Sequence, residues 1–69
     1  MVEVFKTNVQ QTREAKKLIE KINGHFPEFK TNFDLSDCDK ILRVEGKDIL
    51  PHRIIELLKA DNYQCSVLD

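Results

Sequence analysis

The order of hydrophobic patterns along the chain predicts an α+β domain built as strand-helix-strand-strand-helix-strand. Four short stretches alternate apolar and polar residues, two longer ones repeat apolar residues at helical spacing, and turn residues separate them. The chain has 69 residues, which is near the lower size limit for folding alone. We therefore expect one domain over residues 1–69.

The first element is expected to be a strand over residues 2–6. Its side chains alternate, with Val2 and Val4 on one face and Glu3 and Phe5 on the other. We assign the two valines to the side that meets the helices. This assignment leaves Phe5 on the solvent-facing side of the sheet.

The second element is a predicted helix. Asn8 can cap it, with Gln11 three residues later as the capping-box partner. The Asn23-Gly24 pair is expected to end the helix, and Pro27 supports that boundary. Apolar residues recur between these limits at helical spacing, at Ala15, Leu18, Ile19 and Ile22.

The middle of the chain predicts a β-hairpin. Residues 29–35 and 41–45 each alternate apolar and polar side chains, so each is expected to be a strand with one buried face. Residues 36–39 between them have the composition of a turn. Two strands joined by so short a turn pair as neighbours.

A second helix and a last strand complete the order. Pro51 suits the first turn of this helix, and Asp61-Asn62 is expected to end it. Tyr63, Cys65 and Val67 then alternate with polar residues in the predicted strand. The apolar face of the helix consists of Ile54, Leu57 and Leu58.

Right-handed crossovers turn this order into a four-stranded antiparallel sheet, spatial order 4-1-3-2, with both helices on one face. This arrangement is the ferredoxin-like fold. One end of such a domain would gather residues 7–11, 36–39 and 61–62. The other would gather residues 23–27 and 46–51, so candidate site residues can be sorted by the end at which they lie.

Composition excludes several classes of protein. Eleven basic and twelve acidic side chains give a net charge of −1, which argues against a general nucleic-acid binder. No apolar run approaches the roughly 20 residues of a membrane span. The first residues lack the pattern of a signal peptide, and two cysteines without one indicate reduced thiols. We therefore expect a cytoplasmic protein.

Three packing motifs point to a known family. They are Asn32-Phe33-Asp34-Leu35, the Leu42-Val44-Gly46 pattern, and Ile54-Ile55-Glu56-Leu57-Leu58 leading to Asn62-Tyr63. With these motifs the chain resembles the heavy-metal-associated domain of small copper chaperones and metal-pump N-terminal modules. The resemblance covers nearly the whole length. Family members usually have a glycine before the aromatic residue, where this chain has Asn62.

The family's metal motif is not present. The resemblance implies a Cys-x-x-Cys between the first strand and the first helix, and the alignment puts these cysteines at Gln11 and Glu14. Val9 stands where the family has a buried methionine. Cu(I) prefers thiolates, and amide and carboxylate oxygens do not replace them. The chain is therefore expected to be a divergent member with no metal and no cofactor, in which Gln11 and Glu14 belong to the first helical turn.

Cys38, in the hairpin turn, is the remaining weak candidate for a metal ligand. His25 and His52 are expected at the opposite end of the domain, so they cannot join it. The distance between two strands on either side of a third argues against a disulfide to Cys65. There is also no glycine-rich phosphate loop, and no base lies beside a nucleophile. We do not expect an enzyme.

The open sheet face is the candidate interaction surface, with Phe5, Ile41, Arg43 and Leu68 as its residues. The sequence thus favours a small non-catalytic interaction or regulatory module, with an unknown protein partner or weak self-association. One alternative is residual copper or zinc handling through Cys38 or a partner's cysteine. A second is RNA contact through Phe5, which has no aromatic partner on the third strand to complete a stacking surface.

Overall fold

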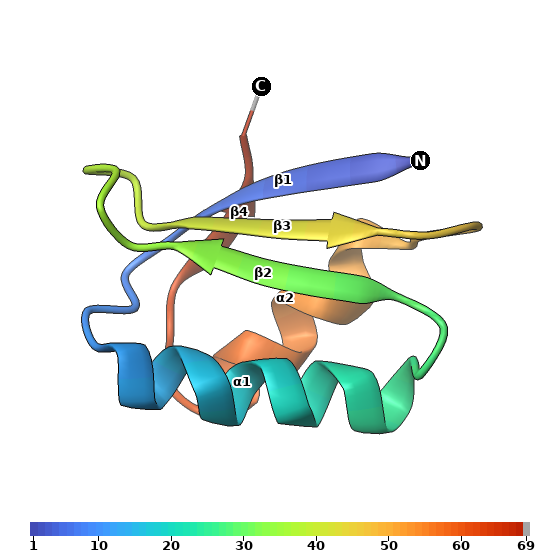
Figure 1. The fold of residues 1–69 in the computed structure, drawn as a ribbon, viewed down its shortest axis with the longest axis horizontal. Helices are drawn as coiled ribbons and strands as arrows, with labels where there is room; N and C mark the ends of the chain where they lie inside the picture. The colour runs from blue at the N-terminus through green and yellow to red at the C-terminus, as the bar shows by residue number, and fades with distance from the viewer. Residues whose placement is uncertain (69) are drawn as a thin grey trace.

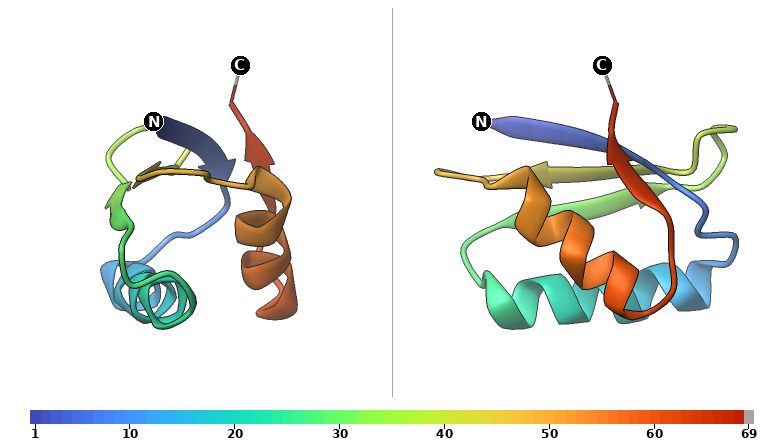
Figure 2. Two further views of the ribbon diagram at one scale, coloured as in Figure 1. Left: turned by 90° about the vertical axis from the view of Figure 1, so that its right-hand side faces the viewer. Right: turned by 180° about the vertical axis from the view of Figure 1, so that it is seen from behind.

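The computed structural model describes residues 1–68 and contains all six expected elements. They are β1 (Val2–Thr7), α1 (Thr12–His25), β2 (Lys30–Asp34), β3 (Ile41–Glu45), α2 (Pro51–Ala60) and β4 (Cys65–Val67). The strands form one antiparallel sheet in the order β2-β3-β1-β4, which is the predicted order read from the other edge. Both helices cover the same face of this sheet (Figure 1, Figure 2). The fold is ferredoxin-like, as predicted.

The orientation predicted for β1 is wrong. Phe5 pairs with Leu42 of β3, and both side chains are completely buried beneath the helices. Val2 is 51 % exposed and lies on the other face. The strand carries apolar residues on both faces, so alternation over residues 2–6 does not decide between them. Burial of the larger phenylalanine surface decides it.

The start of α1 also differs from the prediction. The cap is Gln11 rather than Asn8, and the Gln11 backbone N–H donates to the Glu14 carboxylate at 3.1 Å. The helix also runs past Asn23-Gly24 to His25. The Asn23 side chain accepts a hydrogen bond from the Thr31 hydroxyl, so its polar group is satisfied without ending the helix.

The second helix begins and ends as expected. Pro51 occupies its first turn, and the N–H of Tyr63 donates to the Leu58 carbonyl just beyond its last turn. Asn62, the second residue after the end of α2, has a φ of 68°. This is the left-handed conformation that a Schellman motif requires, and asparagine tolerates it better than most residues.

The core lies between the sheet and the two helices. The buried apolar side chains are Phe5, Val9, Ala15, Leu18, Ile22, Phe29, Leu42, Val44, Ile49, Ile54 and Leu58.

No helix of residues 1–68 is both long enough and apolar enough to cross a membrane.

Backbone contacts fix the two ends of the domain. At one end the Thr7 N–H donates to the Asp39 carbonyl, which joins the end of β1 to the hairpin turn (Figure 1). At the other, the Gly46 N–H donates to the Met1 carbonyl, and Arg53 lies 6.0 Å over the Phe26 ring. This is the sorting of turns that the topology predicted.

Candidate functional site

The connection between β1 and α1, where the family resemblance implies a metal, is occupied by contacts of the helix terminus. The Glu14 carboxylate accepts the Gln11 N–H, and the Arg13 guanidinium donates to the Gln11 side-chain oxygen at 3.1 Å. The Glu14 side chain thus satisfies the backbone N–H of the cap residue, and the Gln11 side chain is held by Arg13. They offer oxygen donors and no sulfur, so this turn has no ligands suited to Cu(I).

A shallow depression of about 400 Å³ lies between the start of α1 and the end of α2. Partial burial and the neighbouring Glu14 carboxylate raise the pKa of the Tyr63 hydroxyl there. Two cationic and two anionic side chains balance in charge around the depression, which gives it no net preference for a charged ligand. The lining residues are Arg13, Glu14, Lys17, Leu18, Asp61 and Tyr63.

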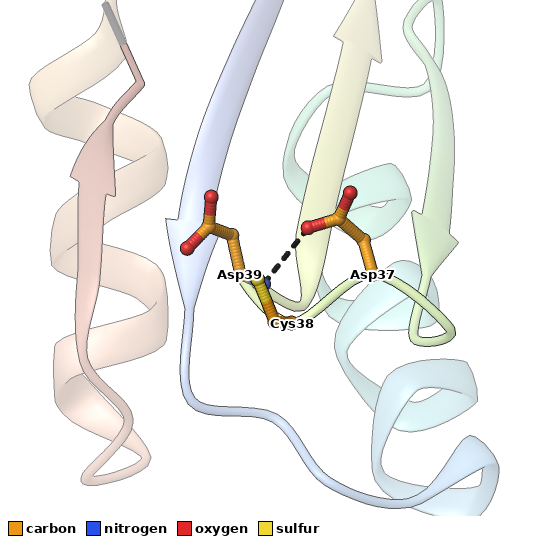
Figure 3. A group of neighbouring side chains, drawn as sticks. All are labelled: Asp37, Cys38 and Asp39. Atoms are coloured by element: carbon orange, nitrogen blue, oxygen red, sulfur yellow. Dashed lines mark hydrogen bonds between the residues drawn. The ribbon is translucent and has the colours of Figure 1, made fainter.

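Asp37, Cys38 and Asp39 form a cluster in the hairpin turn (Figure 3). Their potential ligand atoms lie within 4.8 Å of one another. The Asp37 carboxylate accepts the Asp39 N–H at 2.9 Å, and the Asp39 carboxylate lies 3.8 Å from the Lys6 ammonium. The turn and a surface ion pair thus account for both carboxylates. The exposed Cys38 thiol remains as a soft ligand. His25 cannot join it, because α1 ends with His25 at the opposite end of the domain (Figure 1).

The two cysteines are not bonded to each other. Cys38 is exposed, whereas Cys65 on β4 is half-buried and packs against the core. Partial burial raises the pKa of the Cys65 thiol to about 12. At neutral pH this thiol is protonated, which makes it a poor nucleophile.

The open face of the sheet differs from the predicted interaction surface. Phe5 is absent from it because that ring is buried among the core residues. Ile41, Arg43 and Leu68 do lie on this face, as the strand pairing requires, and their role in binding stays a prediction. The RNA alternative loses its premise, since the described part of this face carries no aromatic side chain for a base to stack on.

Val2 and Val4 take the place of Phe5 on the open face. Leu68 lies beside Val4, because the Leu68 N–H donates to the Val4 carbonyl at 2.9 Å. Extending the alternation to Thr7 and Val9, which are also buried, would have placed Phe5 inside. The apolar residues of the open face are therefore few, namely Val2, Val4, Ile41 and Leu68. Charged side chains lie among them, at Lys6, Lys30, Asp34, Arg43 and Glu45.

The free edge of β2 is a surface that the sequence analysis missed. Within residues 1–68, β2 pairs only with β3, so the backbone groups on its other side have no partner strand, although Thr31 itself is only 7 % exposed. The Leu68–Val4 hydrogen bond shows that Val4 bonds toward β4. By antiparallel alternation, residues 42 and 44 of β3 bond to β1, and residues 41, 43 and 45 bond to β2.

This alternation identifies the outward groups of β2. Lys30, Asn32 and Asp34 bond to β3, so Thr31 and Phe33 direct their N–H and C=O groups to the free edge. The opposite sheet edge, β4, spans three residues, whereas β2 spans five. The longer edge is therefore the better template for an added strand.

An apolar hollow of about 300 Å³ runs along the same edge, between β2 and α1. Figure 2 shows α1 beneath the margin of the sheet that β2 forms. Ile19, Phe33 and Leu35 are half-buried in its wall, so each still offers apolar surface. The complete lining is Thr12, Ala15, Lys16, Ile19, Asn32, Phe33 and Leu35.

No family model, curated protein or solved structure matches this chain.

Proposed function

We propose that this chain is a small non-catalytic protein-interaction module that binds an extended segment of a partner along the free edge of β2. A peptide in this position would continue the sheet through backbone hydrogen bonds to Thr31 and Phe33. Its alternate side chains would point toward the hollow beside α1. Recognition by strand addition requires both parts, an unpaired edge for affinity and an adjoining pocket for specificity.

The observation that carries this proposal is the coincidence of the two features on one strand. Phe33 presents its backbone to the free edge while its ring forms part of the hollow. A bound segment with an apolar side chain would therefore meet the backbone and the pocket together. The open face supports it less well, because charges interrupt its apolar residues.

Metal handling remains the alternative, through Cys38 or a cysteine supplied by a partner. The proposal is that the heavy-metal-associated scaffold persists in this chain without its metal site. Cu(I) or Zn(II) added under reducing conditions should then leave the amide signals of residues 7–14 and 36–39 unchanged. Stoichiometric, sub-micromolar binding at either turn would instead favour the alternative.

Selection from a displayed library of random peptides tests the interaction proposal. Peptides that bind the domain should shift the amide signals of Thr31 and Phe33. Thr31→Pro should abolish their binding, because it removes an outward N–H that the β2–β3 ladder does not use.

Thr31→Val is the matched control for this variant. It loses the same hydroxyl, which donates to Asn23, but keeps the backbone N–H. Peptides should bind Thr31→Val as they bind the original domain. Equal binding to both variants, or failure to select any peptide, would refute the proposed docking site.

A further inference from the structure

We infer that the β2 edge pairs with the β2 edge of a second copy of this chain, antiparallel, about a two-fold axis at Asn32. The inference rests on the proposed function, because it names the partner of the same site. The resulting dimer would have one continuous sheet across the two copies. Symmetric pairing of this kind uses the same surface of both molecules.

The charges of β2 are complementary to themselves in this register. With Asn32 at the axis, Lys30 of one copy lies opposite Asp34 of the other, and the same pair recurs across the axis. Both side chains are exposed. Hydrogen bonds from the Ser36 side chain and backbone lower the pKa of the Asp34 carboxyl, so it is charged at neutral pH. Both of these bonds reach the same oxygen, Oδ1.

The backbone groups agree with the same register. Thr31 of one copy lies opposite Phe33 of the other, and these are the residues whose N–H and C=O groups face outward. Opposed residues of this type exchange two hydrogen bonds. The two-fold axis creates this pair twice, so every outward group of the two residues finds a partner.

Neighbouring registers fit less well. Only shifts by two residues keep the outward backbone groups opposed. One such shift places Lys30 opposite Asn32 of the second copy, and the other places Lys30 opposite Ser36. Neither opposes Lys30 to a carboxylate, so the charges select the register centred on Asn32.

The apolar hollow is covered in the same arrangement. Figure 2 shows α1 beneath β2. In the paired arrangement the two α1 helices therefore approach each other across the axis. Each hollow, with Ile19, Phe33 and Leu35, then faces its equivalent in the second copy. Lys16 is the one charged side chain in the lining. An interface of one short strand and one helix is small, so we expect a dissociation constant in the micromolar to millimolar range.

Charge-swap complementation, followed by sedimentation equilibrium, tests this inference. Lys30→Asp alone should weaken dimerisation roughly tenfold or more, because it opposes two carboxylates on each side of the axis. Asp34→Lys alone should do the same with two ammonium groups. An equimolar mixture should associate as a heterodimer, since both pairs are then of opposite charge.

Controls separate loss of pairing from loss of fold. Lys47→Asp, which changes an exposed charge outside β2, should leave the dimer unchanged. Circular dichroism of each variant checks folding, and recovery in the mixture requires both variants to be folded. If either variant alone does not fold, Lys30→Gln supplies a milder loss of the pair, with a few-fold weakening expected.

The outcomes distinguish the inference from the proposed function. An original chain that stays monomeric at millimolar concentration overturns the inference, and so does a dimer indifferent to both charge changes. In either case, selected peptides that bind Thr31→Val and fail to bind Thr31→Pro would leave the proposed function standing. If the chain dimerises as inferred but no selected peptide distinguishes Thr31→Val from Thr31→Pro, the binding of other proteins at this edge is refuted and the dimer stands.

Discussion

The side-chain oxygen of Asn8 accepts a hydrogen bond from the backbone N–H of Gln64 at 2.8 Å. These residues are far apart in the chain, and the bond joins the connection before α1 to the connection before β4. Asn8 therefore holds two turns of one end together instead of capping the helix. The helix is capped three residues later, at Gln11.

Asn8→Ala should lower the free energy of unfolding by about 0.5–1.5 kcal/mol, because the Gln64 N–H loses its partner. Asn8→Asp keeps an acceptor oxygen and should retain most of the stability. Urea unfolding followed by circular dichroism measures both. Equal losses in the two variants would show that the hydrogen bond is not the cause.

Gly46→Ala should destabilise the domain by about 1–3 kcal/mol, because a Cβ at this position would overlap the Phe29 ring. That ring is buried in the core and has little room to move. Gly24 is the matched control, since a Cβ there meets nothing within 4 Å.

Gly24→Ala should stabilise the domain by about 0.5–1 kcal/mol, as expected for alanine replacing an exposed helical glycine. The same urea unfolding experiment compares the two glycine variants. Effects of the same sign at both positions would contradict the packing described for Gly46.

The stability of the domain should fall as the pH rises from about 9 to about 12. Partial burial raises the pKa of the Cys65 thiol to about 12, against 9.0 for an ordinary cysteine. In this window the folded state keeps a proton that the unfolded state has lost, so alkali favours unfolding. Below about pH 9 the contribution of this thiol to stability is fully present.

Cys65→Ala should flatten this part of the pH profile, and Cys38→Ala should leave it unchanged because Cys38 is exposed. Urea unfolding at a series of alkaline pH values measures the slope. A profile equally steep in both variants would assign the effect to other groups.

The element order and the sheet topology could be predicted because each rests on a strong local signal. The alternation of Phe29, Thr31, Phe33 and Leu35 fixed the buried face of β2 correctly. The hairpin turn and two right-handed crossovers then left one sheet order.

The failed predictions arose where two local signals competed. β1 has Val2 and Val4 on one face and Phe5 and Thr7 on the other, so its inner face is decided by packing against Leu42. Asn8 is a good capping residue, but its oxygen is used by Gln64, which a local reading of the chain cannot reveal. Tertiary contacts override local preference in both cases.

The candidate docking edge was missed for a different reason. Which backbone groups of β2 face outward depends on the hydrogen-bond alternation across three strands, from the Leu68–Val4 bond to β2. Side-chain types carry no record of that alternation. The hollow likewise depends on where α1 lies beneath β2.

Hydrogen exchange of individual β2 amides tests the proposed edge most directly. In the domain at low micromolar concentration, the Asn32 and Asp34 amides should exchange slowly, and those of Thr31 and Phe33 quickly. Saturation with a selected peptide should slow Thr31 and Phe33 by roughly tenfold or more. The opposite alternation in the free domain, or unchanged exchange of these two amides in the complex, would contradict the account.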